Sequence, residues 1–239
     1  MNSPKIELIL GDCMDGMRGM RDKEFELAIV DPPYGIGVGN VGKMTSVSRK
    51  QYTKKSWDEA TPSFEYFEEL RRVSKNQIIW GANFFDGVGL CGGGIVWNKL
   101  GKDIGHRKPI PNLSDCEIAY CSSRNNVKMF SYTQIGNVYG NNYQIDWDQQ
   151  RIHPTQKPVA LYTWLLLNYA HPGDRILDTH AGSMSSIIAC IIAGYSITAY
   201  EIDKEYFEAG CQRVMKFVKQ GDIFREQPQI IINGDIQAY

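Results

Sequence analysis

The chain has 239 residues, 43% of them hydrophobic and 22% charged, the composition of an ordinary globular protein long enough to bury its own core. Its formal net charge of −1 excludes a broadly basic coat for nucleic acid. A local basic face stays open, because binding depends on where the charges lie. The six cysteines include no Cys-x-x-Cys pair, which argues against a zinc site and favours reduced thiols.

Hydrophobic segments long enough for a membrane are missing from the sequence. The longest apolar run, from Ile187 to Ala193, has seven residues, whereas a transmembrane helix needs roughly 20. The N-terminal residues lack the apolar stretch of a secretory signal. We therefore expect a cytoplasmic protein without membrane contact.

Short apolar runs alternate with amphipathic stretches along the chain, which is typical of α/β folds with a mostly parallel sheet. In chain order, the expected strands are Glu7–Leu10, Leu27–Val30, Gln77–Trp80, Gly94–Trp97, Glu117–Cys121, Arg175–Asp178 and Ser196–Glu201. The expected helices are Phe64–Val73, Pro158–Ala170, Ser185–Ala193 and Lys204–Lys219. Proline suits the first position of a helix, where its missing N–H group has no partner in any case. Residues 8–12 and 231–235 also resemble each other, each reading as a strand that ends in a Gly-Asp turn, although such short matches arise by chance.

The tetrapeptide Asp31-Pro32-Pro33-Tyr34 directly follows an expected buried strand. The two prolines fix φ and remove backbone N–H groups, so the carbonyl groups of this turn are free to accept hydrogen bonds. An exocyclic amine offers two hydrogens, which the Asp31 carboxylate and the Pro32 carbonyl can accept, while the Tyr34 ring can stack on a base. A proline-rich turn with a packed tyrosine is the alternative, but open α/β sheets place their sites at this end of a strand.

Residues 35–58 are expected to form a long loop directly after this tetrapeptide. Its basic residues are Lys43, Arg49, Lys50, Lys54 and Lys55, and no acid lies between the first and the last of them. The loop is interpreted either as a solvated segment or as a grip on phosphates, and its place after the tetrapeptide favours the second reading.

A second motif, Asp178-Thr179-His180-Ala181-Gly182-Ser183, joins an expected strand to an apolar helix. A glycine in such a turn lets the backbone approach a ligand, and the helix N-terminus offers free N–H groups. Glu201 follows Gly182 by 19 residues at the end of the next strand, a spacing that suits an acid on ribose hydroxyls. This turn lacks the Gly-x-Gly-x-x-Gly fingerprint, so a nucleoside without phosphates fits it better than a dinucleotide. A plain strand–turn–helix remains the alternative for this motif alone.

Together the two motifs resemble the amino-methyltransferase family of DNA methylases, which has a catalytic Asp-Pro-Pro-Tyr and a cofactor turn that commonly reads Asp-Pro-Phe-x-Gly-Ser-Gly. Here Asp31 precedes Asp178 by 147 residues, an order that resembles the circularly permuted β group. The segment from His153 to Pro158 and the Gly11-Asp12-Cys13 turn also match that group. The resemblance implies a Rossmann-like methyltransferase fold, α/β with a mostly parallel seven-stranded sheet that has one antiparallel strand. It implies a single domain over residues 1–239, with a small DNA-contacting insertion within residues 35–150.

The resemblance also implies roles for particular residues. The flipped base would be held by Asp31, Pro32, Pro33 and Tyr34. S-adenosylmethionine would be bound by Asp12, Cys13, Thr155, Lys157, Asp178, His180, Gly182, Ser183 and Glu201. Within that set, Thr155 and Lys157 would lie near the cofactor carboxylate, while Asp12 competes with Asp235 for the cofactor adenine. DNA would be contacted by the five basic loop residues together with Arg107 and Lys108, and no metal is expected.

Two departures from the family pattern fall in the cofactor turn. Thr179-His180 replaces the Pro-Phe pair, and Met184 replaces the second glycine. The methionine is expected either to crowd the loop, which would weaken cofactor binding, or to occupy the first turn of the helix.

The predicted function is methylation of the 6-amino group of an adenine that is rotated out of double-stranded DNA. Cytosine-N4 methylation and a non-catalytic DNA-binding relic of the same fold stay open as alternatives. In the family, Ser-Pro-Pro-Tyr is usual for cytosine, so Asp31 favours adenine. A homodimer and a separate restriction endonuclease partner are both consistent with the resemblance, as is a bacterial or phage origin.

Overall fold

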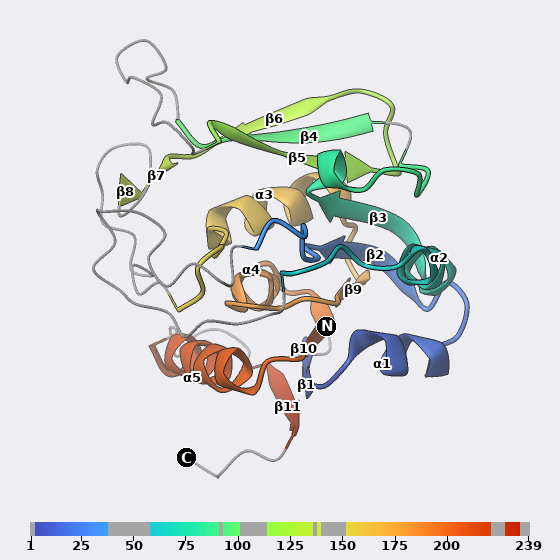
Figure 1. The fold of residues 1–239 in the computed structure, drawn as a ribbon. Coiled ribbons are helices and arrows are strands. Elements are labelled where there is room, and N and C mark those ends of the chain that lie inside the picture. Colours follow the sequence, from blue (N-terminus) through green and yellow to red (C-terminus); the bar gives the residue numbers. More distant parts are fainter. Residues whose placement is uncertain are drawn as a thin grey trace.

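The computed structural model describes residues 3–37, 58–90, 93–100, 114–135, 138–139, 152–220 and 228–234. Within these ranges a nine-stranded sheet runs through the molecule in the order β11-β1-β10-β9-β2-β3-β5-β4-β6 (Figure 1). Its strands are β1 (Lys5–Leu10), β2 (Phe25–Val30), β3 (Ser74–Trp80), β4 (Gly93–Asn98), β5 (Cys116–Cys121), β6 (Lys128–Ser131), β9 (Arg175–Asp178), β10 (Ser196–Glu201) and β11 (Gln229–Asn233). A separate two-stranded ribbon pairs β7 (Gln134–Ile135) with β8 (Val138–Tyr139).

The sheet is parallel except at β5, which runs antiparallel to both of its neighbours, β3 and β4. The expected α/β class and the single antiparallel strand are therefore confirmed. The expected number of seven strands was too low, because β6 and β11 add one strand at each edge. The two similar segments at residues 8–12 and 231–235 belong to adjacent strands, since β1 and β11 pair in parallel with Leu8 opposite Ile232.

Helices cover both faces of the sheet (Figure 1). They are α1 (Cys13–Gly19), α2 (Phe64–Val73), α3 (Val159–Tyr169), α4 (Ser185–Ala193) and α5 (Lys204–Gln220). Side chains of α3, α4 and α5 form one apolar core with the sheet, and side chains of α1 and α2 form a second core on the other face. On β2, Leu27 and Ile29 point into the first core and Ala28 and Val30 into the second, so the last four residues of the strand are apolar on both faces.

The observed helices differ from the expected ones at both ends of α3, at the last residue of α5 and by the presence of α1. Pro158 is the N-cap of α3, with φ −71° and ψ 145°, so the helix begins at Val159 rather than at the proline. The short helix α1 was not expected from the sequence; Asp12 caps it by accepting a hydrogen bond from the Met14 N–H at 2.8 Å. None of the helices in the described ranges is both long and apolar enough to cross a membrane.

The strand order brings distant parts of the chain together at the carboxyl ends of four neighbouring strands. β9 and β10, from the C-terminal half, lie between β1 and β2 from the N-terminal half. All four strands are parallel, so their carboxyl ends point the same way. The residues that follow them, including Asp12, Asp31, Thr179 and Ile202, therefore emerge at the same edge, where open α/β sheets hold their ligands.

Candidate functional site

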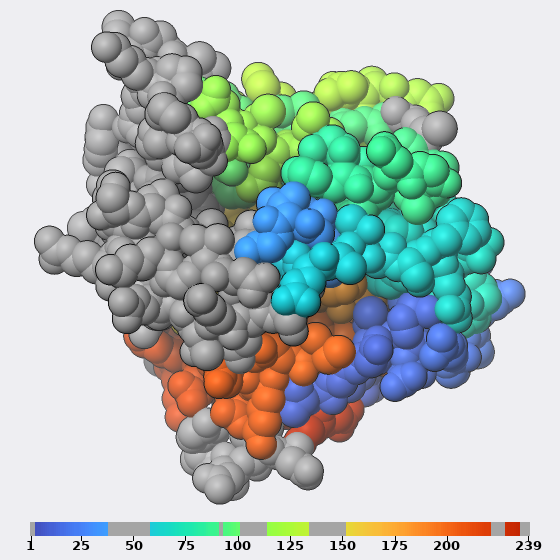
Figure 2. All heavy atoms as spheres, viewed as in Figure 1, coloured from blue at the N-terminus to red at the C-terminus, as the bar shows by residue number. Residues whose placement is uncertain are grey.

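The turn after β2 is held in shape by an aspartate that sequence reasoning missed. Asp58 is buried, and its Oδ1 accepts hydrogen bonds from the backbone N–H groups of Tyr34 at 2.8 Å and Gly35 at 3.0 Å. Its carbonyl group accepts a third, from the Gly37 N–H at 2.9 Å. Figure 2 shows the segment after β2 lying directly against the segment that leads into α2 on the molecular surface. The signal in the sequence was slight: Asp58 and Glu59 are two adjacent acids that follow the basic residues and belong to no motif.

The Tyr34 ring is fixed by aromatic and glycine contacts from the turn after β3. Phe84, in the short 3-10 helix Ala82–Phe84, stacks on it with ring centroids 4.9 Å apart and an angle of 12° between the planes. Phe85 meets it edge-on at 6.1 Å. Gly81 has φ +73°, and a Cβ atom at this position would lie 2.1 Å from the Tyr34 ring. Only glycine therefore suits position 81, both for its backbone and for the space beside Tyr34.

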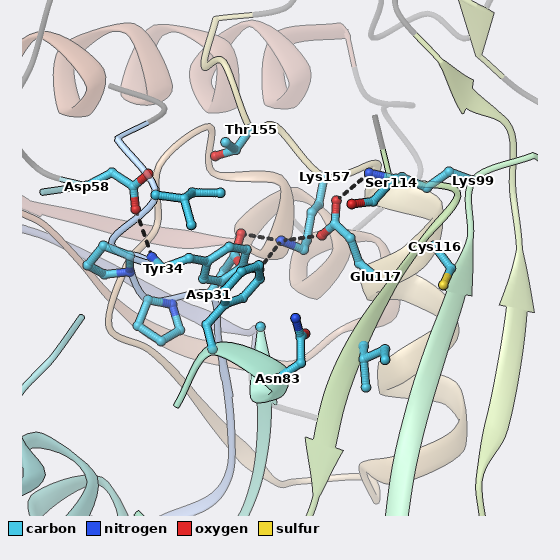
Figure 3. A pocket seen from close by; sticks show the side chains of 16 residues that line it. Asp31, Tyr34, Asp58, Asn83, Lys99, Ser114, Cys116, Glu117, Thr155 and Lys157 are labelled. Carbon is cyan, nitrogen blue, oxygen red and sulfur yellow. Dashed lines mark hydrogen bonds and ion pairs between the residues drawn. The ribbon is translucent and has the colours of Figure 1, made fainter. Parts of the chain in front are cut away.

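A row of charged groups runs from Asp31 into the sheet (Figure 3). Asp31 Oδ1 accepts a hydrogen bond from the Tyr34 hydroxyl at 2.6 Å, and Oδ2 accepts one from Lys157 Nζ at 2.5 Å. Lys157 Nζ also lies 3.1 Å from Glu117 Oε2, and Lys99 Nζ lies 2.9 Å from Glu117 Oε1. The Lys157 side chain is 3% exposed, so its charge depends on the two carboxylates beside it.

The pKa values in this row follow from burial and from the alternation of charge. Burial alone would raise the pKa of Glu117, but Lys157 and Lys99 together lower it to about 2. Burial alone would lower the pKa of Lys157, but Asp31 and Glu117 raise it. Burial raises the pKa of Asp31, against the opposing effect of Lys157. The surroundings of Glu117 thus stabilise its charged form, whereas those of Asp31 stabilise the charged form less.

Two cavities meet at Asp31. The first, of about 290 Å³, lies between the turns after β2 and β3 and strand β5. The second, of about 280 Å³, lies over the turns after β9 and β10. The two cavities share four of their lining residues, which are Asp31, Pro33, Thr155 and Lys157. A group bound in one cavity therefore lies next to a group bound in the other, across the Asp31 carboxylate.

The second cavity contains most of the residues expected to bind a cofactor. Besides the four shared residues, it is lined by His153, Gln156, Tyr162, His180, Ala181, Gly182, Ser183, Glu201, Ile202 and Tyr206. Glu201 accepts hydrogen bonds from the backbone N–H groups of Gly182 at 2.7 Å and Asp203 at 2.9 Å. Burial nevertheless raises the pKa of Glu201 to about 7. The His153 ring, whose part in this wall sequence reasoning missed, packs edge-on against Tyr206 at 4.3 Å.

Three expected cofactor residues are not among those that line this cavity, although all three lie in the described ranges. Asp178 is buried and accepts hydrogen bonds from Ser186 Oγ at 2.5 Å and the His180 N–H at 3.0 Å, which shapes the turn itself. Asp12 caps α1, and Cys13 is the first residue of that helix, where burial raises the pKa of its thiol to about 12. These side chains support the turns around the cavity.

Met184 does not crowd the second cavity. It is the N-cap of α4 in the left-handed region, with φ 59° and ψ 30°, where the family pattern has glycine. Its side chain is fully buried and points toward Gly210, where a Cβ atom would lie 2.8 Å from the methionine sulfur. Gly210 on α5 leaves space for this side chain. The geometry therefore does not support the expectation that Met184 would crowd the cofactor loop.

Thr179 and His180, which replace the Pro-Phe pair of the family pattern, form a small polar network. The Thr179 hydroxyl lies 2.7 Å from the Tyr66 hydroxyl and 2.9 Å from His180 Nδ1. The His180 ring meets the Tyr66 ring edge-on at 5.4 Å. Burial lowers the pKa of His180 to about 4, so the imidazole is neutral in the folded protein.

The residues expected to contact DNA lie outside the described ranges. They are Lys43, Arg49, Lys50, Lys54, Lys55, Arg107 and Lys108. Asp235, the competitor of Asp12 for a cofactor adenine, also lies outside these ranges.

Comparisons with known proteins agree on one class. A family model described as a DNA methylase, N6_N4_Mtase, matches residues 93–212, just over half of the chain. The Type II methyltransferase M2.MboI of Moraxella bovis is 26% identical in an alignment that covers 85% of each chain. The Type II methyltransferase M.HpaI of Haemophilus parainfluenzae is 24% identical in an alignment that covers 87% of this chain and 73% of the relative.

Solved structures show the same fold. TTHA0409 of Thermus thermophilus, a putative DNA modification methylase complexed with S-adenosyl-L-methionine, superposes with a TM-score of 0.56 at 16% identity. The match covers 96% of this chain and all of that one. The cytosine-N4-specific PvuII DNA methyltransferase superposes with a TM-score of 0.53 at 12% identity, covering 95% and 93% of the two chains.

The buried neutral histidine predicts how stability depends on pH. The folded-state pKa of His180, about 4, lies below its ordinary value of 6.5, so between these values the unfolded chain binds the extra proton. The stability that comes from neutral His180 is complete above pH 6.5 and is lost as the pH falls toward 4. We expect the free energy of unfolding of the wild type, relative to His180→Phe, to fall by roughly 2 kcal/mol between pH 7.5 and pH 5. Urea denaturation of both proteins at both pH values measures this difference, and parallel pH profiles would contradict it.

Proposed function

The chain belongs to the DNA methylase family, and we propose that it is an adenine-N6 methyltransferase that uses S-adenosylmethionine. The observation that carries this proposal is the pair of cavities that share Asp31, Pro33, Thr155 and Lys157. Methyl transfer needs the donor and the acceptor nitrogen side by side and in line, and such positioning contributes roughly 7–11 kcal/mol to catalysis. Two cavities separated by one carboxylate supply this arrangement.

The second cavity suits the methyl donor. Glu201 ends β10 and faces this cavity, so its carboxylate can accept hydrogen bonds from ribose hydroxyls. The turn at Gly182 and Ser183 brings the backbone close to the ligand, and the walls include the rings of Tyr162, His180 and Tyr206. When bound, S-adenosylmethionine supplies a methyl group on a positively charged sulfur, so no metal is needed to activate it. The complex of TTHA0409 with this cofactor supports the assignment.

The first cavity suits the target base. Asp31 and Pro32 both line this cavity, and we assign the two hydrogens of an exocyclic amine to the Asp31 carboxylate and the Pro32 carbonyl, which leaves the nitrogen lone pair for the methyl group. The Tyr34 ring can stack on the base, an interaction worth roughly 1–3 kcal/mol in proteins that bind single strands. A base reaches this cavity only when it is rotated out of the duplex, which costs a few kcal/mol. Asp31 need not be a strong base, because the amine proton becomes acidic only as the methyl group is transferred.

The choice of adenine rests on Asp31 at the first position of the tetrapeptide. The alternative is cytosine-N4 methylation, since the PvuII enzyme has the same fold and acts on cytosine. Double-stranded DNA is the proposed substrate. The relatives from Moraxella bovis and Haemophilus parainfluenzae, both named Type II methyltransferases, support a cytoplasmic enzyme of bacterial or phage origin. They also favour pairing with a separate restriction endonuclease, whereas the homodimer rests on resemblance to the β group alone.

The proposal predicts methyl transfer to adenine that depends on Asp31. Labelled S-adenosylmethionine and unmethylated genomic DNA are incubated with the enzyme, and the nucleosides are identified by mass spectrometry. We expect label in 6-methyladenine, and a kcat for Asp31→Asn lower by roughly 100- to 1,000-fold, because the variant loses a preorganised acceptor. Label in 4-methylcytosine would overturn the base assignment, and near-normal turnover by Asp31→Asn would overturn its role.

The packing of Tyr34 predicts a different effect at two glycines. Gly81 and Gly87 both have φ +73°, but a Cβ atom meets the Tyr34 ring only at Gly81 and has no neighbour within 4 Å at Gly87. We expect Gly87→Ala to cost about 1 kcal/mol of stability through backbone strain, and Gly81→Ala to cost more, because its Cβ atom also collides with the Tyr34 ring. Only Gly81→Ala is expected to lower kcat, by roughly 100-fold, because it displaces Tyr34. Thermal melting and the methylation assay measure both effects, and equal activities of the two variants would contradict the proposed role of Tyr34.

A further inference from the structure

Lys157 occupies a place that its sequence motif did not predict. The resemblance put it near the cofactor carboxylate, and it lines the second cavity, but its ammonium group also lies 2.5 Å from Asp31 Oδ2 and 3.1 Å from Glu117 Oε2 (Figure 3). It also donates to the Tyr34 hydroxyl at 3.2 Å. The lysine thus lies between two carboxylates, one in the turn after β2 and one in β5, at the partition between the two cavities.

This arrangement limits what Asp31 can do for the reaction. One of its oxygens accepts from Tyr34 and the other from Lys157, so both already have a donor. A carboxylate bonded to a buried ammonium group is a weaker acceptor for a neutral amine, because the ammonium group draws on the same electron density. Each carboxylate oxygen has a second lone pair, so the amino group of a base competes with Lys157 for Asp31 Oδ2 and is held more strongly when the bond from Lys157 lengthens.

We propose that Glu117 is a positioning residue that takes over Lys157 when the target base binds. As the amino group of the base reaches Asp31, the Lys157 ammonium group shifts its hydrogen bond from Asp31 Oδ2 to Glu117 Oε2. Asp31 Oδ2 is then free to accept from the amine, and the lysine keeps an anionic partner throughout. This inference rests on the proposed methyl transfer and assigns to it a residue outside both sequence motifs.

Glu117 is well placed for this exchange. It belongs to β5, lines the first cavity, and its Oε2 is already within 3.1 Å of the ammonium group, so a small movement of the lysine is enough. Lys99 binds the other oxygen, Oε1, at 2.9 Å and keeps the carboxylate charged and oriented. The ring centroids of Trp80 and Tyr34 lie 5.5 Å and 5.7 Å from Lys157 Nζ, so both rings attract the cation. Neither ring contact uses Glu117 Oε2.

A purely structural role for Glu117 and the proposed exchange lead to different expected effects of Glu117→Gln. If Glu117 only neutralised a buried lysine, Glu117→Gln would lower stability and leave the turnover of the folded enzyme unchanged. If the exchange occurs, Glu117→Gln leaves Lys157 bound to Asp31, so the loss appears in kcat. That loss then depends on Lys157 being present, because the lysine is what blocks Asp31.

The test is a double-mutant cycle with Glu117→Gln, Lys157→Met and the double variant, assayed on unmethylated DNA at saturating S-adenosylmethionine. We expect Glu117→Gln to lower kcat by roughly 10- to 100-fold, the effect of one hydrogen bond to a charged group. Cofactor affinity, followed by calorimetry, should change less than about twofold in this variant, because Glu117 is not among the residues that line the cofactor cavity. In the Lys157→Met background, Glu117→Gln should have little further effect on kcat.

Two further variants keep the test decisive. Glu117→Asp retains the charge and is expected to restore kcat toward the wild-type value, even if Glu117→Gln folds poorly. Glu68→Gln, at an exposed position on α2, is the matched control for the same chemical change and should behave as the wild type. Multiplicative losses in the double variant, or an unchanged kcat for Glu117→Gln, would overturn the exchange. Such results with an active wild type leave the proposed function intact, whereas a wild type that methylates no DNA would refute that function itself.

Discussion

The parallel pairing of β2 with β9 is the constraint on which the site depends. Leu27 lies opposite Ile176 and Ala28 opposite Leu177, so two strands about 150 residues apart in the chain end side by side. The turn that carries Asp31 and the turn that carries Gly182 are consequently neighbours at one edge of the sheet. Without this pairing the two motifs would form separate turns, and no carboxylate would lie between the two cavities.

Buried charge is the second feature that organises the site. Lys157 is almost fully buried, and a lone ammonium group at that depth would lose its proton or destabilise the fold. Asp31 and Glu117 flank it, and Lys99 balances Glu117 on the far side. Because the row alternates in sign, each group stabilises the charge of the next. The same alternation allows Lys157 to move its hydrogen bond from one carboxylate to the other without a proton transfer and without a change in net charge.

The departures in the cofactor turn are accommodated by residues elsewhere in the fold. Met184 adopts a backbone conformation that favours glycine, and its side chain fills the space that Gly210 leaves on α5. His180 is kept neutral by burial and lies in a network with Thr179 and Tyr66 of α2. Neither residue closes the cofactor cavity, and the intact site geometry argues against a relic that only binds DNA.

The sequence by itself determined the local features of this protein: the seven strands first expected, the main helices, the turn after β2 and the acid at the end of β10. These follow from periodicity, from proline and glycine, and from the position of a polar residue at a strand end, all of which are encoded within about a dozen neighbouring residues. Only the tertiary structure decided that Asp58, Gly81, Phe84 and Glu117 belong to the site. Each sits on a segment that carries no distinctive motif when read alone, and each reaches the Asp31–Tyr34 turn or Lys157 only because buried strands from distant parts of the chain pack together. Which strands pair depends on the surfaces that they bury jointly, and that information is spread over the whole chain.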